Sequence, residues 1–354
     1  MRKSIYSMTK PQLQQWLLYN DEKKSRADLI WESLYQDLST NFEEMTALSE
    51  QLLRKLQDQF LINPLTIVEI QEGGDKTTKF LFRLASNALI ETVLMHQTYG
   101  SSVCVTTQIG CNIGCRFCAS GLLTKQADLE AGEIVAQVVF VKRYLKERSS
   151  SNQVTHITVM GIGEPFDNYD EVIRFLSIVT DQKGMSIAPR RITVSTSGLA
   201  PKIRRFATES LPVNLAVSLH APNDQIRSQL MRINDAYPMA ELFDAIKEYI
   251  AKTKHRVFFE YIMIKDLNDQ KSHAIELAEL LLPLGKYAYV NLIPYNPVEE
   301  NSFLRSERPT INKFLDELMQ SGVNCIVRKE LGAEIDGACG QLRSQYIKQE
   351  IQIL

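Results

Sequence analysis

The sequence lacks the features that mark membrane-inserted, secreted or broadly basic proteins. No apolar run approaches the roughly 20 residues that a membrane-spanning helix needs. The first residues, MRKSIYSMTK, have no apolar core like that of a signal peptide. The formal net charge is −2, so no overall basic field indicates a nucleic-acid partner. We therefore expect a cytoplasmic protein with no membrane partner, in which any RNA must meet a local basic patch.

Cysteine is scarce, with six residues in 354, yet four of them lie close together. They are Cys104, Cys111, Cys115 and Cys118, and the last three have the spacing C-x3-C-x2-C. Three thiolates on one short loop can bind three irons of a cubane cluster and leave the fourth iron open to a ligand. A zinc site would usually add a second cysteine pair or nearby histidines, and inert buried thiols are a further alternative. The spacing favours an iron–sulfur site.

Residues 1–62 are predicted to form an N-terminal helical accessory domain. Apolar residues recur at helical spacing in 11–18, after the candidate N-cap Thr9, and again in 27–34 and 45–60. Such a module could contact a nucleic acid or pack as a cap on the rest of the chain. The sequence leaves both possibilities open.

Residues 63–100 change to a period of two, which is typical of strands. Apolar and β-branched residues alternate through 66–70, 79–83 and 89–94, and a Gly73-Gly74-Asp75 turn separates the first two runs. We predict a small antiparallel β extension in this region.

Strand and helix patterns alternate through a third region at 101–300, and a C-terminal segment follows at 301–354. Such alternation favours βα units with right-handed crossovers and a parallel sheet. We predict an α/β fold with an open, partial (β/α)6 barrel, whose ligands bind at the carboxyl ends of the strands. The strand candidates are Val103–Thr107, His156–Met160, Ile192–Thr196, Leu215–Leu219, Val257–Ile264, Tyr289–Ile293 and Asn324–Arg328. The helix candidates are Leu129–Leu145, Tyr169–Thr180, Met239–Thr253, Ser272–Leu284 and Ile311–Gln320.

Short polar motifs follow several of these strands. In GIGEP (161–165), the glycines allow the backbone to approach a ligand, and Glu164 can accept a hydrogen bond from an ammonium group or a ribose hydroxyl. Hydroxyl and imidazole groups in STSG and SLHAP can bind carboxylate or ribose groups. Ordinary turns and loop starts that satisfy backbone groups are the alternatives. The candidate ligand-binding residues are Gly163, Glu164, Ser195, Ser218, Leu219, His220 and Asn296.

Two further cysteines lie outside the clustered motif. Cys339 lies in IDGACGQLRS, where small and polar neighbours indicate a mobile loop that presents the thiol. A buried small side chain is the weaker alternative. Cys325 lies in the apolar run Cys325-Ile326-Val327 and is predicted to be a core residue.

Together these motifs resemble those of the RlmN/Cfr family of radical SAM RNA methyltransferases. The similarity rests on VCVTTQIGCNIGCRFCAS (103–120), GIGEP, STSG (195–198), SLHAPND (218–224), IPYNP (293–297) and IDGACGQLRS (335–344). It spans nearly the whole chain and implies a TIM-like radical SAM barrel. It also implies a [4Fe–4S] cluster held by Cys111, Cys115 and Cys118, and S-adenosylmethionine (SAM) bound by the strand-end residues.

The resemblance further implies roles for Cys339, Cys104 and Glu91. One SAM methylates Cys339, and the deoxyadenosyl radical from a second SAM removes hydrogen from that methyl group. The resulting methylene radical adds to an adenine amidine carbon of RNA, and Glu91 removes the ring proton. Cys104 then releases the product by forming a disulfide with Cys339. An amidine carbon is not nucleophilic, so a radical route suits this carbon better than polar methyl transfer.

Members of this family make 2-methyladenosine in 23S rRNA and in tRNA, or 8-methyladenosine on the same rRNA nucleotide, which confers antibiotic resistance. The motif context is more similar to the C2 branch. The implied partners are 23S rRNA, tRNA and a flavodoxin- or ferredoxin-type electron donor. Adenine-C8 methylation, and an iron–sulfur redox protein without an RNA substrate, remain as alternatives.

A local cluster of basic residues is the candidate RNA-binding surface. Its members are Arg190, Arg191, Lys202, Arg204 and Arg205. Phosphate contacts from such side chains would make binding depend on salt. A solvated helix face is an equally good interpretation of the same residues.

Overall fold

A single open sheet runs through most of the chain in the computed structural model of the protein. The structure describes residues 2–122, 124–148, 151–298 and 301–329, together with Leu331, Gly332, Ile335 and Tyr346. Residues 336–345, which include the predicted Cys339 loop, lie outside the described residues. In the described part of the chain, no helix has both the length and the apolar character to cross a bilayer.

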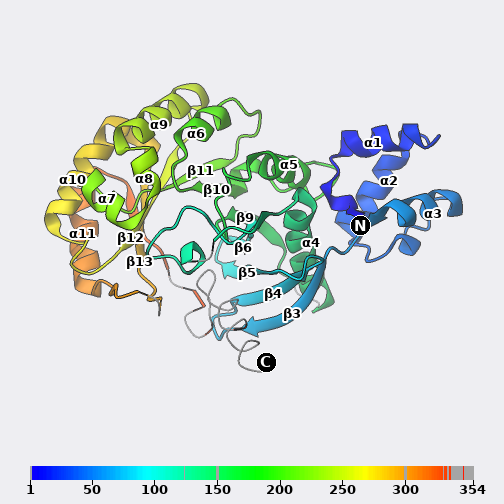
Figure 1. Cartoon of the computed structure of the whole chain (residues 1–354), viewed down its shortest axis with the longest axis horizontal. Helices are drawn as coiled ribbons and strands as arrows, with labels where there is room; N and C mark the ends of the chain where they lie inside the picture. Colours follow the sequence, from blue (N-terminus) through cyan, green and yellow to red (C-terminus); the bar gives the residue numbers. More distant parts are fainter. Residues whose placement is uncertain are drawn as a thin grey trace.

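The parallel strands follow one another in chain order, as predicted for a barrel of βα units (Figure 1). They are β6 (Gly100–Cys104), β9 (Val154–Val159), β10 (Ile192–Thr196), β11 (Asn214–Ser218), β12 (Val257–Met263), β13 (Ala288–Pro294) and β14 (Cys325–Val327). All seven strand candidates are thus present, Asn324–Arg328 as the short β14, so the sheet has one parallel strand more than the predicted (β/α)6 barrel. The strand order is linear from β14 to β3, so the barrel is partial and does not close.

The predicted β extension is continuous with the barrel sheet. Its strands are β3 (Leu65–Glu72), β4 (Thr78–Leu84) and β5 (Leu89–Gln97). These strands are antiparallel, and β5 also pairs with β6, where Val93 lies opposite Cys104. One ten-stranded sheet therefore joins the extension to the first barrel strand.

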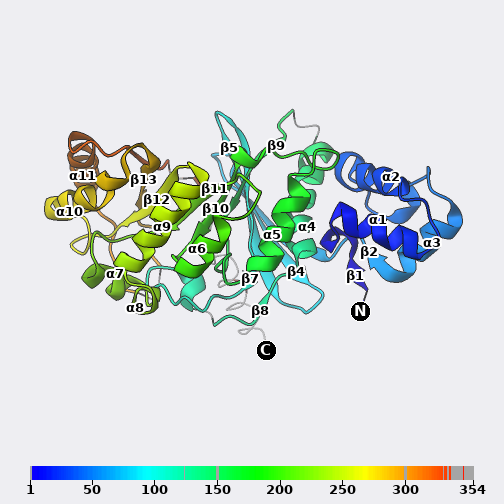
Figure 2. The ribbon, with the colours of Figure 1, turned by 90° about the horizontal axis from the view of Figure 1, so that it is seen from above.

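Helices cover the outer face of the sheet (Figures 1 and 2). They are α4 (Ala131–Glu147), α5 (Tyr169–Val179), α6 (Ala200–Phe206), α9 (Met239–Thr253), α10 (Lys271–Leu281) and α11 (Arg308–Gln320). Two further helices, α7 (Asp224–Leu230) and α8 (Ile233–Ala236), lie instead at the carboxyl ends of the strands. The sequence pattern predicted all of these except α6, α7 and α8. Those three are too short for a clear apolar period, because α8 has a single turn and the other two have seven residues each.

The two faces of the parallel strands differ in chemistry because alternate side chains point to opposite sides. Residues such as Leu215, Val217 and Phe259 are fully buried beneath the helices. The register places a second, polar set on the inner, concave face of successive strands: Cys104, Thr158, Ser195, Ser218, Glu260 and Asn291. A polar inner face is suited to a ligand rather than to a packed core.

The N-terminal helices pack as a cap on the outside of α4. They are α1 (Lys10–Tyr19), α2 (Arg26–Glu32) and α3 (Glu50–Gln59), with a π-helical turn, Ser33–Asp37, directly after α2. Thr9 is the N-cap of α1, as predicted, and it forms a capping box with Gln12; such a cap typically stabilises a helix start by about 1 kcal/mol. Arg143 of α4 donates to the carbonyl of Leu38 at 2.9 Å. This module lies at one end of the elongated molecule (Figure 2).

Candidate active site

The three cysteines of the C-x3-C-x2-C motif lie on the loop that follows β6 and the short β7 (Gln108–Ile109). Gly114 has a φ of +66°, which favours glycine, so the chain can turn sharply before Cys115. The Arg116 N–H donates to the carbonyl of Leu230, the last residue of α7, at 3.0 Å. The loop is thereby fixed at the carboxyl edge of the parallel strands, where ligands were predicted to bind.

The cysteine loop disfavours the thiolate forms of Cys111 and Cys115 unless positive charge is added. Burial, followed by the charges of Glu164 and Cys118, raises the pKa of Cys111 to about 12. Burial also raises the pKa of Cys115 well above its ordinary value, and the neighbouring Cys118 and Cys111 add to the rise. Bound iron ions would supply the compensating charge, because a metal binds the thiolate form. This donor set therefore fits a [4Fe–4S] cluster.

The GIGEP loop holds the Glu164 carboxylate rigidly. Glu164 Oε2 accepts from the Ser197 N–H at 2.7 Å, and Oε1 accepts from the Phe166 N–H at 2.9 Å. Burial raises the pKa of Glu164, and these hydrogen bonds oppose the rise. Gly163 has a φ of +108°, and a Cβ there would lie 2.6 Å from Gln108 Cβ. A carboxylate oxygen can accept more than one hydrogen bond, so Glu164 is chemically suited to bind an ammonium group or a hydroxyl as well.

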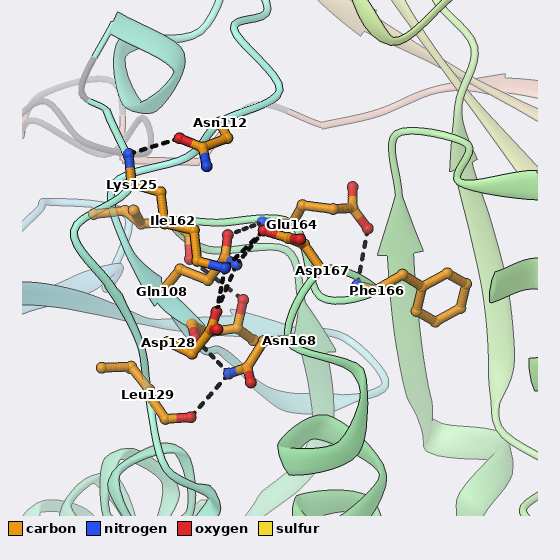
Figure 3. A network of polar contacts seen from close by, with 11 residues as sticks. Gln108, Asn112, Lys125, Asp128, Leu129, Ile162, Glu164, Phe166, Asp167 and Asn168 are labelled. Carbon is orange, nitrogen blue, oxygen red and sulfur yellow. Dashed lines mark hydrogen bonds and ion pairs between the residues drawn. The ribbon is translucent and has the colours of Figure 1, made fainter. Parts of the chain in front are cut away.

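A polar network joins the GIGEP loop to the segment that follows the cysteines (Figure 3). Gln108 accepts from the Glu164 N–H at 2.8 Å, and its amide donates to Asp128 at 2.8 Å and to Asp167 at 3.0 Å. Lys125 pairs with both of these aspartates at 2.8 Å. The sequence analysis did not single out Gln108, although it lies inside the recognised VCVTTQIGC motif. The network positions the Glu164 loop relative to the cysteine loop.

The predicted polar residues on β10, β11 and β13 lie at the same edge of the sheet. Ser195 and Ser218 are half-buried on the inner face of neighbouring strands, and Ser195 pairs with Ala216, two residues before Ser218. Asn296 is exposed and lies two residues after the end of β13. All three are placed where a ligand at the carboxyl ends could reach them.

His220 is buried and faces the cysteine loop. Its Nδ1 accepts from the Ile262 N–H at 3.0 Å, so the neutral ring carries its proton on Nε2. Burial, with a contribution from the charge of Arg227, lowers the pKa of His220 to about 3, so the ring stays neutral. The ring of Phe117 meets it edge-on at 4.7 Å between centroids. The neighbouring Leu219 has its side chain in the core, so only its backbone is available to a ligand.

Arg227, which the sequence analysis did not single out, is a fully buried cation between two strand ends. Its guanidinium donates to the carbonyl of Ser197 at 2.6 Å, to the carbonyl of Ser218 at 3.4 Å and to Asn234 at 2.9 Å. Burial lowers the pKa of Arg227 to about 10, while Cys115 and Asp224 oppose the shift. Arg227 holds the ends of β10 and β11 together beneath the cysteine loop.

The predicted proton acceptor Glu91 lies just beyond the carboxyl end of β6. The Thr106 hydroxyl donates to its carbonyl at 2.6 Å. Its carboxylate is buried and forms an ion pair with Lys79, at 3.1 Å between Oε2 and Nζ. Lys79 was not predicted to be functional, because nothing in the sequence indicates that this strand lysine is buried.

Cys104, the last residue of β6, shares the inner face with this ion pair. Burial raises the pKa of the Cys104 thiol. Hydrogen bonds from Thr158 and the Met160 backbone, and the charges of Arg328 and Lys79, all lower it. The structure thus brings Cys104 and Glu91 together, and it places both on strands next to the cysteine loop.

The predicted partner of Cys104, Cys339, lies outside the described residues. The described residues on either side of it contact the β extension. The Gly332 N–H donates to Asp75 at 2.7 Å, and Tyr346 packs against Leu81 and Leu89. Cys325 is buried, as predicted, and donates to the Leu315 carbonyl at 3.7 Å.

The candidate basic patch is divided and largely charge-compensated. Arg204 pairs with Glu248 at 3.0 Å, and Arg205 pairs with Asp170 at 2.6 Å. Arg190 and Arg191 precede β10, so they lie at the amino edge of the sheet, away from the cysteine loop. The solvated helix face is therefore the better interpretation for Arg204 and Arg205.

Comparisons with known proteins agree with the arrangement of the site. Residues 4–62 match the ribosomal RNA large subunit methyltransferase N-terminal domain. Residues 105–278 match the radical SAM superfamily, whose members use a [4Fe–4S] cluster and SAM. A crystal structure of a radical SAM methyltransferase from Sphaerobacter thermophilus has a TM-score of 0.91 and 41% identity to this chain, covering 96% of it and 98% of the Sphaerobacter chain.

Two relatives extend the similarity over the full length. A Streptococcus pneumoniae protein named probable dual-specificity RNA methyltransferase RlmN is 56% identical and covers 99% of this chain and 98% of its own length. An Enterococcus faecalis protein of the same name is 55% identical, with the same coverage of each chain. The chain therefore belongs to the RlmN family of radical SAM RNA methyltransferases.

Proposed function

We propose that this chain methylates C2 of adenine, in 23S rRNA near the peptidyl-transferase centre and in tRNA beside the anticodon. The observation that carries the proposal is the full-length similarity, at 56% identity, to a relative named as a dual-specificity RNA methyltransferase. The placement of Glu91 and Cys104 on one face of the sheet, beside the cysteine loop, supports it.

In this proposal the cysteine loop and the strand ends hold the two cofactors. Cys111, Cys115 and Cys118 bind the [4Fe–4S] cluster. Glu164 accepts hydrogen bonds from the amino group of SAM, and the Nε2–H of His220 donates to an acceptor on it. The backbone at Gly163 and Leu219, with the side chains of Ser195, Ser218 and Asn296, completes the pocket. When bound, the cluster and SAM together supply a 5′-deoxyadenosyl radical.

The protein's own groups then carry the methyl group to RNA. Cys339 accepts a methyl group from one SAM, and a second SAM serves as the radical source, so two are used per turnover. After loss of a hydrogen atom, the methylene carbon on Cys339 joins adenine C2. Glu91 takes the ring proton, and the unpaired electron of the adduct would return to the cluster. The Cys104 thiolate then attacks the Cys339 sulfur to form a disulfide, and the methylene carbon leaves that sulfur with the bonding electron pair and takes up a proton to become the methyl group of the freed base. A flavodoxin- or ferredoxin-type protein is the proposed electron donor.

The geometry of the β extension supports this sequence of events. Glu91 lies on β5, and the described residues flanking the Cys339 segment contact the same extension through Asp75 and Leu81. The target adenine must leave its stack to reach the inner face, as enzymes that act on bases require. The polar inner face provides room for hydrogen-bonding groups rather than packed apolar side chains.

The test is mass spectrometry of nucleosides from a strain that lacks its own enzyme and expresses this chain. We expect 2-methyladenosine in both 23S rRNA and tRNA. A Cys111→Ala variant, which lacks one cluster ligand, is the matched control and should give neither product. If 8-methyladenosine appears instead, the chain is a C8 methyltransferase; if no methyladenosine appears, the proposal is wrong.

A further inference from the structure

Arg227 of α7 is a completely buried cation whose hydrogen bonds go to neutral groups. Its guanidinium donates to the carbonyls of Ser197 and Ser218 and to the side-chain oxygen of Asn234. Asn234 in turn donates to the Asp224 carboxylate at 2.8 Å, so this acid is linked to Arg227 through an amide. Burial of a charge is costly, and these hydrogen bonds add no compensating negative charge. The positive charge is therefore available to act on a further group nearby.

Helix α7 holds Arg227 next to the cysteine loop. The Leu230 carbonyl, three residues later on the helix, accepts from the N–H of Arg116, which lies directly after Cys115. Leu230 also belongs to a buried apolar cluster against which Cys115 and Phe117 pack. Burial raises the pKa of Cys115, and the charge of Arg227 opposes that rise. The guanidinium is thus fixed, by hydrogen bonds and by packing, where its charge acts on a proposed cluster ligand.

Acidic groups near the loop have the opposite effect. Burial raises the pKa of Cys111 and Cys115, and the negative charge of Glu164 raises both further. Asp167 adds to the rise at Cys111. Negative charge on the loop is therefore disfavoured by burial and by these acids, and Arg227 offsets part of that effect at Cys115.

We propose that Arg227 raises the reduction potential of the [4Fe–4S] cluster bound at the cysteine loop, so that a flavodoxin- or ferredoxin-type donor reduces it more readily. This inference rests on the proposed binding of the cluster by the three cysteines. Reduction moves one electron from the donor to the cluster and adds one negative charge beside the fixed cation. Net charge and burial are among the factors that set cluster potentials. A buried cation has a strong effect because the surrounding dielectric is low and salt screens it little.

A purely structural role for Arg227 makes a different prediction. Arg227→Lys keeps the positive charge but loses hydrogen bonds that only the forked guanidinium can make. Arg227→Met loses both the charge and the hydrogen bonds. If Arg227 served only to hold the strand ends, the two variants would disturb the cluster alike. If its charge acts on the cluster, only Arg227→Met lowers the potential.

The test is an anaerobic redox titration of the cluster-loaded protein, without SAM or RNA, followed by electron paramagnetic resonance of the reduced cluster. At a given solution potential, Arg227→Met should lower the ratio of reduced to oxidised cluster by about tenfold, which is a midpoint shift of about 59 mV for a one-electron couple. Arg227→Lys should keep the midpoint close to that of the unsubstituted protein. Iron content and absorbance establish that each variant is loaded.

Arg232→Met is the matched control, because this arginine approaches the same loop from an exposed position. A Cβ at Gly114, which precedes Cys115, would lie 3.8 Å from Arg232 Cδ. The Arg232 side chain is exposed, so water and salt screen its charge. Arg232→Met should therefore leave the midpoint unchanged. Equal shifts in Arg227→Met and Arg232→Met would overturn the proposal, as would an unchanged midpoint in Arg227→Met or an equal shift in Arg227→Lys.

If Arg227→Met does not fold, Arg227→Gln takes its place, because glutamine keeps a hydrogen-bond donor and removes the charge. The comparison is then between Arg227→Gln and Arg227→Lys, which both lose hydrogen bonds and differ in charge. A midpoint lower in Arg227→Gln supports the proposal, and equal midpoints refute it.

The proposed function fails separately from this inference. The iron content of Cys111→Ala tests the binding of the cluster by the cysteine loop, and methyladenosine formation by the unsubstituted protein tests the function. The midpoint potentials are measured without RNA and test only the influence of Arg227 on the cluster.

Discussion

At the scale of single residues, Cys104 allows the proposed chemistry to be interrupted at one step. Its thiol lies at the carboxyl end of β6 on the inner face, where it can reach a bound intermediate. We expect Cys104→Ala to accumulate a covalent protein–RNA adduct, because the thioether can form but cannot be resolved. The measurement is a gel shift that survives denaturing detergent and disappears after RNase treatment.

The remaining cysteines provide the controls for this experiment. Cys339→Ala should form no adduct and no methyladenosine, while iron content and SAM cleavage are retained. Cys325→Ala changes a buried core thiol and should methylate RNA without forming an adduct. Absence of the adduct in Cys104→Ala, with product formed normally, would remove Cys104 from the resolving role.

A second residue, Arg227, is expected to stabilise the folded protein, and its effect on the free energy of unfolding can be measured without RNA. Its buried guanidinium donates to the carbonyls of Ser197 and Ser218 at the ends of two neighbouring strands. We expect Arg227→Met to lower the free energy of unfolding by about 3 kcal/mol, since buried hydrogen bonds to a charged group are each worth about 1.5–3 kcal/mol. Urea denaturation measures this loss.

The control for this variant is Arg232→Met. Arg232 is exposed on the following turn, so its replacement should change the free energy of unfolding by less than about 0.5 kcal/mol. Similar losses in both variants would contradict the role of Arg227.

At the scale of secondary-structure elements, the GIGEP loop depends on one backbone conformation. A Cβ at Gly163 would meet Gln108 at 2.6 Å, in a backbone region that disfavours side chains. We therefore expect Gly163→Ala to displace the loop and weaken SAM binding at least tenfold, as measured by anaerobic calorimetry on the cluster-loaded protein.

Gly285 offers a matched control for this substitution. It also has a positive φ, +55°, but a Cβ there meets nothing within 4 Å, and the residue lies between α10 and β13, far along the chain from the loop. Gly285→Ala should carry a similar backbone cost and leave SAM affinity unchanged. If Gly163→Ala binds SAM as tightly as the unsubstituted protein, the loop geometry is not what limits binding.

The sequence pattern predicted the presence of individual strands and helices more reliably than it predicted which strands pair with one another. The barrel strands are short, apolar and rich in β-branched residues, so their periodicity was sufficient to find them. The pairing of β5 with β6 was not predicted, because a strand pattern does not specify the partner strand. The burial of Lys79 and the bonds of Arg227 were missed for the same reason, since both depend on contacts between distant segments. The cysteine motif was found because its spacing is itself the chemical signal.

At the scale of the whole molecule, the continuous sheet explains why residues far apart in sequence act at one site. β5 and β6 bring Glu91 and Cys104 to the inner face, and the later strands add Ser195 and Ser218 to the same edge. The helical cap packs along the outside of α4, where the Gly132 N–H at the start of the helix donates to the Ser7 hydroxyl and Arg143 further along donates to the Leu38 carbonyl.

The distribution of basic residues over the whole molecule bears on where RNA binds. Net charge is −2, and Arg190 and Arg191 lie at the amino edge of the sheet rather than beside the cysteine loop. A phosphate contact contributes about 0.7–0.9 to the slope of log affinity against log salt concentration. We therefore expect Arg190→Ala/Arg191→Ala to leave that slope unchanged for RNA binding, measured by fluorescence anisotropy across a salt series. A decrease of about 1.5 or more would show that RNA wraps around to the amino edge, and that the binding surface extends well beyond the mouth of the barrel.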